Sequence, residues 1–519
     1  MLTDELKYRI REALHHIPTV EQERAMDVFA TFMTDRHDQA AMILRGSAGT
    51  GKTTLAAAIV RAMLSLGQKM VLLAPTGRAA KVFSLYAGQP AYTIHRRIYR
   101  QRSLEGAFEL NYNMEGDTLF IIDEASMIAN SPQSDSVFAN GMLLDDLIQF
   151  VYNGRNCRML LIGDSAQLPP VGQTESPALQ AGVMRSYGLH VHESTFAEVL
   201  GQSQESGILW NATRLRADVR QWADGERPAL PQIRFSGFTD ISVVPGDELI
   251  EQLASSYANV GMDETMVVTR SNKRANIYNQ GIRNTVLDRE EELCIGDRLM
   301  VVKNNYFWIN YNLAQSGQLP PQSPTPQPQS NSPQPQANTF TFIANGDMAV
   351  VRRVRHVHEQ YGFRFAEVTM SFPDYDDYEL TATVLLDTLT SEAPALTREQ
   401  QTLLYNKVLE DYADIPHKQD RLKKLREDRY YNALQVKFAY AATCHKAQGG
   451  QWEHIYVDQG YMTDDMLTPD YLHWLYTAFT RATRNLYLVN WPRTQTAEDE
   501  EQHLPITGLL AEATDTLEK

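Results

Sequence analysis

The segment Gly46-Ser47-Ala48-Gly49-Thr50-Gly51-Lys52-Thr53 has the residue types and the spacing of a phosphate-binding loop. Its glycines allow backbone N–H groups to curl around phosphate oxygens, and the start of the following helix adds positive potential. We expect Lys52 to reach the β and γ phosphates of a nucleotide and the Thr53 hydroxyl to coordinate Mg²⁺. The predicted nucleotide-binding residues of this segment are Gly46, Ala48, Gly49, Thr50, Gly51, Lys52, Thr53 and Thr54.

Two acidic residues, Asp123 and Glu124, directly follow the apolar run 119–122. Within a sheet that also carries the phosphate loop, Asp123 would hold Mg²⁺, mostly through water, and Glu124 would orient and deprotonate the attacking water. Taken alone, an Asp-Glu pair at a strand end is more often a turn. Gln167 follows a further apolar run, and its amide could sense a γ-phosphate, although Pro169-Pro170 also fits a plain rigid turn. Together these residues predict nucleotide hydrolysis.

Short apolar runs bounded by turn residues must position these side chains. They alternate with helical patterns such as 53–66, and this alternation predicts parallel sheets with crossover helices. The pattern returns later in the chain, so we predict an α/β protein with two such units, the second of them split. The predicted strands are 41–44, 70–74, 119–122 and 159–162 in the first unit, and 241–244, 266–269, 455–457 and 486–489 in the second.

The second unit is interrupted between about residues 296 and 432. Four segments there are rich in β-branched and aromatic residues, which predicts a small antiparallel β module: 298–302, 347–357, 363–370 and 378–386. Residues 316–336 combine seven prolines with Gln and Ser, a composition that cannot bury enough apolar surface to offset its ordering entropy. We therefore predict a disordered loop, a polyproline ligand for a partner being the alternative. Residues 397–431 have a charged helical pattern.

Composition restricts the class of protein. The 519 residues are 43% hydrophobic and 22% charged, which excludes wholesale disorder and a fibrous repeat. The apolar runs fall far short of the roughly 20 residues that span a bilayer, and the N-terminal residues lack the apolar core of a signal peptide. We expect a soluble, cytoplasmic protein with no membrane partner. The net charge of −16 argues against a surface that is basic throughout, but it allows a local basic channel for nucleic acid.

Taken in order, these motifs resemble those of superfamily 1B helicases, the branch of RecD-like and Dda-like enzymes, over nearly the whole chain. The phosphate loop, the acidic pair and the Gln167 loop are similar to family motifs I, II and III. Segments similar to the Q motif, motif Ia, motif V and motif VI are 19–22, 74–80 with 93–95, 442–449 and 476–482.

The resemblance implies two tandem RecA-like domains, residues 1–192 and residues 193–295 with 433–519. It also implies a small 1B insertion at about 86–112 and an SH3-like 2B subdomain at 296–432. The arginines 96, 97, 100 and 102 fall where the family carries this insertion and a strand-separating pin. A solvated helix face is the equal alternative for them.

Roles for individual residues also follow from the resemblance. Gln22 would recognise adenine, Gly449 would belong to the nucleotide site, and Arg481 would be an arginine finger that the second RecA-like domain presents to ATP. Single-stranded DNA would be contacted by Pro75, Thr76, Arg78, Thr93, His95, Thr443, His445 and Lys446.

The implied activity is Mg²⁺-dependent ATP hydrolysis that drives 5′→3′ movement of a monomer on single-stranded DNA and unwinding at junctions with duplex. An RNA helicase of the same superfamily is the first alternative, because contact with a 2′-OH needs only one polar group in reach. The second is a hydrolysis-weakened ATP-dependent DNA clamp, since Gly201 stands where the family has an arginine on the γ-phosphate. Gly450 is a milder departure, at a position that is usually a small hydroxyl residue.

Overall fold

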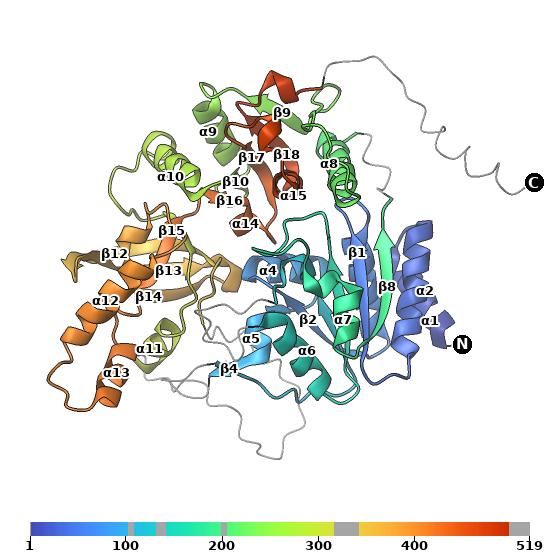
Figure 1. Ribbon diagram of the computed structural model, residues 1–519, viewed down its shortest axis with the longest axis horizontal. Helices are drawn as coiled ribbons and strands as arrows, with labels where there is room; N and C mark the ends of the chain where they lie inside the picture. The colour runs from blue at the N-terminus through green and yellow to red at the C-terminus, as the bar shows by residue number, and fades with distance from the viewer. Residues whose placement is uncertain (1, 102–107, 131–141, 199–204, 316–341, 498–519) are drawn as a thin grey trace, which may run out of the picture.

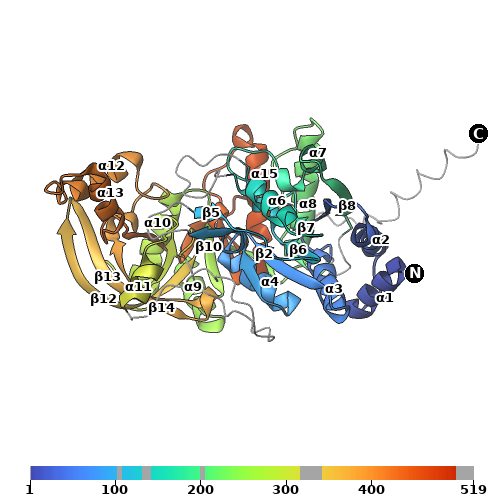
Figure 2. The same cartoon turned by 90° about the horizontal axis from the view of Figure 1, so that it is seen from below.

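The computed structural model of the chain describes residues 2–101, 108–130, 142–198, 205–315 and 342–497. These residues form two parallel β sheets, a closed β barrel and a short two-stranded hairpin (Figure 1). The sheets lie in two separate RecA-like α/β domains, and the barrel lies at the left of both Figure 1 and the perpendicular view in Figure 2. The predicted fold class, two tandem α/β domains with an inserted β module, is confirmed. Gly201 and the proline-rich segment 316–336 lie outside the described residues.

The first sheet has the strand order β3-β2-β6-β7-β1-β8, and all its pairs are parallel. Successive side chains of a strand point to opposite faces. Alternate residues of β1 therefore pack in the hydrophobic cores on opposite faces of this sheet. Met42 and Leu44 pack with α1, α2 and α3, whereas Ala41 and Ile43 pack with α5 and α6. Helices therefore cover both faces, which is why continuous apolar runs mark these strands in the sequence.

The strands of this domain are β1 (Ala40–Gly46), β2 (Lys69–Ala74), β3 (Ala91–Thr93), β6 (Thr118–Ile122), β7 (Arg158–Gly163) and β8 (His190–Phe196), with the hairpin β4 (Tyr99–Gln101) and β5 (Phe108–Leu110). Its helices are α1 (Leu2–Leu14), α2 (Val20–Thr34), α3 (Lys52–Ser65), α4 (Gly77–Ala87), α5 (Ile94–Ile98), α6 (Leu143–Asn153) and α7 (Ala181–Ser186), with the short turns η1 (Ala125–Met127) and η2 (Pro177–Leu179).

The second sheet, β16-β10-β17-β18-β9, is also wholly parallel. Leu215 of α8 and Leu475 of α15 pack on one side of it, and Leu253 of α9 packs in a core that continues into the barrel. The strands are β9 (Ile241–Val244), β10 (Thr265–Thr269), β16 (Ala441–Thr443), β17 (Trp452–Asp458) and β18 (Ala482–Val489). The helices are α8 (Gly207–Ala223), α9 (Leu249–Asn259), α10 (Asn272–Gly281), α14 (Cys444–Ala447) and α15 (Pro469–Phe479).

The barrel closes through β14 and β15, which run parallel to each other, while its other neighbouring strands are antiparallel. The four strands predicted for the module pair antiparallel, as expected, and the parallel pair arises from a fifth strand, β15, which the prediction left outside the module. A parallel pair needs a long crossover connection, and the helical segment after β14 provides it. The elements are β11 (Arg298–Val301), β12 (Met348–Gln360), β13 (Phe363–Phe372), β14 (Tyr378–Leu385), β15 (Leu434–Phe438), α11 (Trp308–Gln315), η5 (Pro373–Tyr375), α12 (Arg398–Glu410) and α13 (Lys418–Arg426).

Three predicted boundaries are displaced. The division after residue 192 falls inside β8, which stays in the first sheet to Phe196. The barrel does not end at residue 432, because β15 pairs with β11 and β14. Since β3 belongs to the first sheet, the insertion predicted at 86–112 reduces to the hairpin of β4 and β5. Among the described helices, none combines the length and the apolarity needed to cross a lipid bilayer.

Candidate active site

The phosphate loop connects β1 to α3 at the carboxyl end of the first sheet. Gly49 and Gly51 have left-handed backbones, with φ of 75° and 77°, which glycine adopts without the penalty that a Cβ imposes. A Cβ on Gly46 would lie 2.9 Å from Thr50 Oγ1, and that hydroxyl donates to the Ser47 carbonyl at 2.8 Å. The segment thus forms the tight turn that the motif predicts, with α3 beginning at Lys52.

Asp123 and Glu124 follow β6 at the same edge of the sheet. Asp123 accepts hydrogen bonds from Tyr86 Oη of α4 and, at 2.9 Å, from the backbone N–H of Glu124. Burial, and then the charge of Glu124, raises the pKa of Asp123 to about 6, while the charge of Lys52 opposes this shift. Glu124 has a left-handed backbone, with φ of 52°, a strained conformation that is typical of functional sites. The predicted catalytic pair therefore lies beside the phosphate loop.

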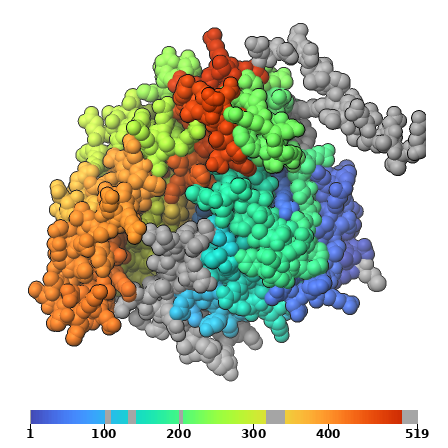
Figure 3. Space-filling model, in the orientation of Figure 1, coloured from blue at the N-terminus to red at the C-terminus, as the bar shows by residue number. Residues whose placement is uncertain are grey.

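The loop after β7 is joined to the second domain through Tyr476 of α15. The Tyr476 hydroxyl donates to Asp164 Oδ2 at 2.6 Å and accepts the N–H of Ala48, in the phosphate loop, at 2.9 Å. The neighbouring Thr477 Oγ1 accepts the N–H of Leu168 at 2.7 Å. The space-filling view shows the second domain seated on the first (Figure 3). Sequence reasoning missed this bridge, because Tyr476 lies 428 residues from Ala48.

Two predicted amide side chains are buried with one atom unpaired. Gln167 is 6% exposed, and its Oε1 has no hydrogen-bond partner among the described residues. Gln22 is fully buried: its Oε1 accepts the Thr19 N–H at 3.1 Å in a capping box of α2, while its Nε2 has no partner among the described residues. An unpaired buried polar atom is costly unless a ligand or water pairs with it. Both amides therefore fit ligand-facing roles.

Arg481 and Gly449, also predicted for the nucleotide site, contact the protein as follows. Arg481 is 2% exposed and donates to the Thr477 carbonyl, the Gly450 carbonyl and Thr480 Oγ1 at 3.1 to 3.2 Å. All these acceptors belong to its own domain. A Cβ on Gly449 would lie 3.1 Å from Thr76 Oγ1, so Gly449 contacts the start of α4.

A further cation, Arg216 of α8, lies near the bridge. Arg216 is 9% exposed, and its Nη1 has no partner among the described residues. Burial, and then the charge of Arg220, lowers the pKa of Arg216, while Tyr476 and Asp164 act in the opposite direction. The sequence carries no signal for this residue, because an arginine on a helix is most often solvated.

The residues predicted to contact DNA lie at the carboxyl ends of β2, β3 and β16, which are at or next to one edge of each sheet. Pro75 and Thr76 follow β2, Thr93 ends β3, and Thr443 ends β16, directly before His445 and Lys446 in α14. The hydroxyls of Thr76 and Thr93 cap α4 and α5, where they accept N–H groups at 3.2 and 3.3 Å. Gly449 lies close to Thr76, so the predicted DNA contacts of the first domain lie next to those of the second domain.

Three of these side chains are engaged within the protein. Arg78 donates to the Gln451 carbonyl at 2.8 Å and lies 4.6 Å from the ring centre of Trp452, so it links the domains. Lys446 donates to Asn345 of the barrel, and burial lowers its pKa to about 8. Burial also lowers the pKa of His95, to about 4.

The basic stretch before the hairpin is anchored to its surroundings. Arg96 stacks on Tyr375 of the barrel at 3.9 Å, and Tyr375 Oη donates to Asp347 at 2.6 Å. Arg97 pairs with Glu115. Arg100 lies over Tyr112. The interpretation as a solvated helix face therefore fails for Arg96, and Arg102 lies outside the described residues.

Comparison with known proteins agrees with this arrangement. Residues 19–190 match the AAA domain family, and residues 438–489 match the UvrD-like helicase C-terminal domain family. The ATP-dependent RecD2 DNA helicase of Deinococcus radiodurans is 35% identical over 136 residues, which cover 25% of this chain and 16% of that protein. The ATP-dependent DNA helicase dda of Enterobacteria phage T4 is 26% identical over 270 residues, which cover 50% of this chain and 55% of that one. The chain thus spans only part of the length of these relatives.

A structural comparison finds Pif1 helicases over most of the chain. The crystal structure of a Bacteroides Pif1 helicase in complex with ADP-AlF3 and single-stranded DNA covers 93% of this chain and 95% of that one, at 14% identity and a TM-score of 0.41. A Candida albicans Pif1 helicase covers 93% and 97%, at 15% identity and a TM-score of 0.39.

Proposed function

We propose that this chain is a helicase of superfamily 1B, an ATP-dependent DNA helicase that moves 5′→3′ along single-stranded DNA. The observation that carries the proposal is the Tyr476 bridge between Ala48 and Asp164. Backbone N–H groups of such a loop bind phosphate. A nucleotide would therefore compete with Tyr476 of the second domain for the N–H of Ala48. Nucleotide binding and release would therefore change how the two domains meet.

The same two domains carry the predicted contacts to the strand. One group follows β2 and β3 in the first domain, and the other follows β16 in the second. A change in the distance between the domains would move one group along the strand relative to the other. Contacts to the backbone by such residues need not depend on base sequence, which suits a motor that moves along any strand.

The residues at the phosphate loop fit an Mg²⁺–ATP complex. The tight glycine turn, the buried carboxylate of Asp123 and the exposed Thr53 offer backbone N–H groups and oxygen ligands, which phosphate and Mg²⁺ respectively prefer. Thr53 and Asp123 would hold Mg²⁺, which when bound neutralises charge on the phosphates. Lys52 would bind the β and γ phosphates. Glu124 would take the proton of the attacking water while Gln167 Oε1 accepts a hydrogen bond from that water.

We infer that Arg216 supplies a cation to the transferred phosphate. The charges of Tyr476 and Asp164 act on its guanidinium, and its Nη1 has no partner within the described part of the chain, which supports a role beside the phosphate loop. In the family this contact with the γ-phosphate is made by an arginine at the position of Gly201. Arg216 would make the contact here. Arg481 would have to leave three hydrogen bonds within its own domain to reach the nucleotide.

The test compares Lys52→Ala with Lys69→Ala, a matched control at the exposed, opposite end of the sheet. We expect Lys52→Ala to lower DNA-stimulated ATP turnover at least about 100-fold, the cost of one preorganised transition-state contact. Lys69→Ala should remain within about twofold of the wild type. A Lys52→Ala variant with wild-type turnover would refute the site.

Partner and direction are tested with matched substrates. The wild type should unwind a duplex with a 5′ single-stranded overhang and leave a 3′ overhang intact. Equal stimulation of ATP turnover by RNA and DNA oligonucleotides would favour the RNA helicase. Turnover without unwinding of either overhang would favour the clamp.

A further inference from the structure

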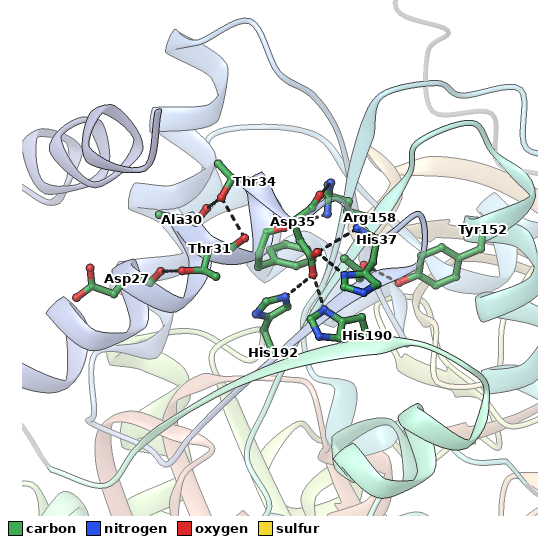
Figure 4. Close-up of polar contacts among 12 residues, drawn as sticks. Asp27, Ala30, Thr31, Thr34, Asp35, His37, Tyr152, Arg158, His190 and His192 are labelled. Atoms are coloured by element: carbon green, nitrogen blue, oxygen red, sulfur yellow. Dashed lines mark hydrogen bonds and ion pairs between the residues drawn. The ribbon is translucent and has the colours of Figure 1, made fainter. Parts of the chain in front are cut away.

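Three histidines surround one aspartate at the end of the first sheet opposite the phosphate loop (Figure 4). Asp35 Oδ1 lies 2.7 Å from His37 Nδ1, and Asp35 Oδ2 lies 2.5 Å from His190 Nδ1 and 2.7 Å from His192 Nε2. Among the described residues, the Asp35, His37 and His190 ligand atoms form a group within 4.8 Å of one another. Nitrogens of three imidazoles thus lie around one carboxylate, and those of His37 and His190 are the two that belong to this close group.

Two short sequence pairs build this cluster. His190 and His192 are two positions apart on β8, so both side chains lie on the same face of the strand. Asp35 caps the C-terminal end of α2, and His37 follows two residues later in the connection to β1. The pairs Asp35-x-His37 and His190-x-His192 therefore face each other across the edge of the sheet.

Surrounding groups hold the cluster in place. The backbone N–H of His37 donates to Asp35 Oδ1 at 3.0 Å, which orients the carboxylate. Arg158 of β7 donates to the carbonyls of Phe32, at 2.9 Å, and Asp35, which fixes the backbone at the helix end. The ring of Phe32 meets the His192 ring edge-on at 5.9 Å. Supporting contacts of this kind are what a metal site needs in order to hold its ligands ready.

We propose that Asp35, His37, His190 and His192 form a Zn²⁺ site. Asp35, His37 and His190 supply three ligand atoms within 4.8 Å of one another, and His192, which lies 2.7 Å from the same carboxylate, would turn toward the ion to complete the four-coordinate set that Zn²⁺ takes in proteins. This donor set favours Zn²⁺ over Mg²⁺ and Ca²⁺, which take oxygen ligands. The His37 and His190 side chains are 64% and 49% exposed, so an ion from solvent can reach their ring nitrogens.

The site is structural in kind. With His192 as the fourth ligand, no open position would remain for a substrate, as in structural zinc sites. The ion would join the end of α2 to the start of β8, an edge strand that is otherwise bonded on one side only. Binding to the folded chain alone would raise its stability.

The test uses the untagged full-length chain, because an affinity tag of histidines binds the same ions. Calorimetric titration with Zn²⁺ in excess Mg²⁺ should show one saturable site per chain, and Zn²⁺ should raise the thermal midpoint. The double variant His37→Ala/His190→Ala should bind Zn²⁺ at least about 100-fold more weakly, since losing even a group that only orients a ligand costs about 10- to 100-fold. Its thermal midpoint should not respond to Zn²⁺.

The control His16→Ala/His417→Ala removes two exposed histidines far from the cluster in sequence and should behave as the wild type. Co²⁺ bound to the wild type should give the strong visible absorption of a tetrahedral ion. Binding that is unsaturable, or equal in the wild type and the cluster variant, would overturn the site. So would the weak absorption of octahedral Co²⁺. Because the readouts are metal binding and thermal stability, the result does not depend on the proposed helicase activity.

Discussion

The two α/β domains place an aspartate at the same point of a parallel sheet and surround it differently. In the first domain Asp123 follows β6, where burial and Glu124 raise its pKa to about 6. In the second domain Asp458 ends β17 and accepts Arg274 Nε at 2.6 Å and Tyr278 Oη at 2.5 Å. The sheet fixes where each carboxylate lies. The neighbouring helices determine whether its charge is used inside the protein or remains for a ligand.

The largest expected effect separates the two aspartates by activity. Asp123→Asn should lower DNA-stimulated ATP turnover by about 100- to 1000-fold, because it removes the carboxylate that would hold Mg²⁺ beside the phosphates. Asp458→Asn should leave turnover per folded molecule within about twofold. Steady-state kinetics on the two variants measures the ratio, and similar losses in both would contradict the comparison.

The second effect is on stability, and here the Asp458 variant should lose more than the Asp123 variant. Asp458→Asn should lower the free energy of unfolding by about 2 kcal/mol, because it weakens charge-assisted hydrogen bonds to a partly exposed arginine. Asp123→Asn should be neutral or stabilising, since it removes a carboxylate that burial disfavours. Urea unfolding without nucleotide gives both values. A loss of stability in Asp123→Asn as large as in Asp458→Asn would argue against unequal surroundings.

The third prediction compares two arginines of the second domain and tests which of them contributes to ATP hydrolysis. Arg216→Ala should lower turnover about tenfold, a loss of about 1.4 kcal/mol in transition-state stabilisation, with little change in the KM for ATP. Arg214→Ala is the matched control, because it lies on the same helix and its guanidinium stacks 5.1 Å from Trp210. Equal turnover in the two variants would remove Arg216 from the mechanism.

The smallest effect extends the comparison to the barrel, where Asp347 is buried and lacks a bonded cation among the partners that the structure describes. Burial raises its pKa to about 6, from an ordinary value of 3.8. The protonated form is thus favoured by folding, so the stabilisation is complete below pH about 4 and is lost as the pH rises through about 6. Stability should fall by about 1 kcal/mol more between pH 5 and pH 7 in the wild type than in Asp347→Asn. Parallel profiles would contradict this.

Strands buried on both faces were predictable from the sequence, and an edge strand was not. The runs that became β1, β2, β6 and β7 are continuous and apolar, because helices cover both sides of the sheet. β8 reads His-Val-His-Glu-Ser-Thr-Phe, and its alternating polar residues gave no reason to extend the first domain to Phe196. β15 reads Leu-Gln-Val-Lys-Phe and lies far along the chain from the other barrel strands, so only the pairing in space assigns it to the barrel.

The phosphate loop was predictable because its chemistry is local. Eight consecutive residues carry the glycines, the lysine and the threonine, and the fold brings only their partners from elsewhere. The Tyr476 bridge, Arg216 and the Asp35 cluster depend on contacts between distant segments, which no spacing along the chain encodes. The pair His190-x-His192 was the one available signal, since two histidines at strand spacing share a face.

The contacts at the two ends of α2 have a mechanical consequence. Glu21 accepts the N–H groups of Ala197 and Glu198 just after β8, and Asp35 binds the histidines at its start. In the proposed motor, a force that the bound DNA exerts on the second domain would be transmitted to the first domain through the connection from β8 to α8. Because β8 runs parallel to β1 from Ala40 to Gly46, a pull along it loads the whole ladder in shear, where the bonds share the force. Because α2 contacts both ends of β8, it would help to keep this edge strand from sliding along β1 under such a force.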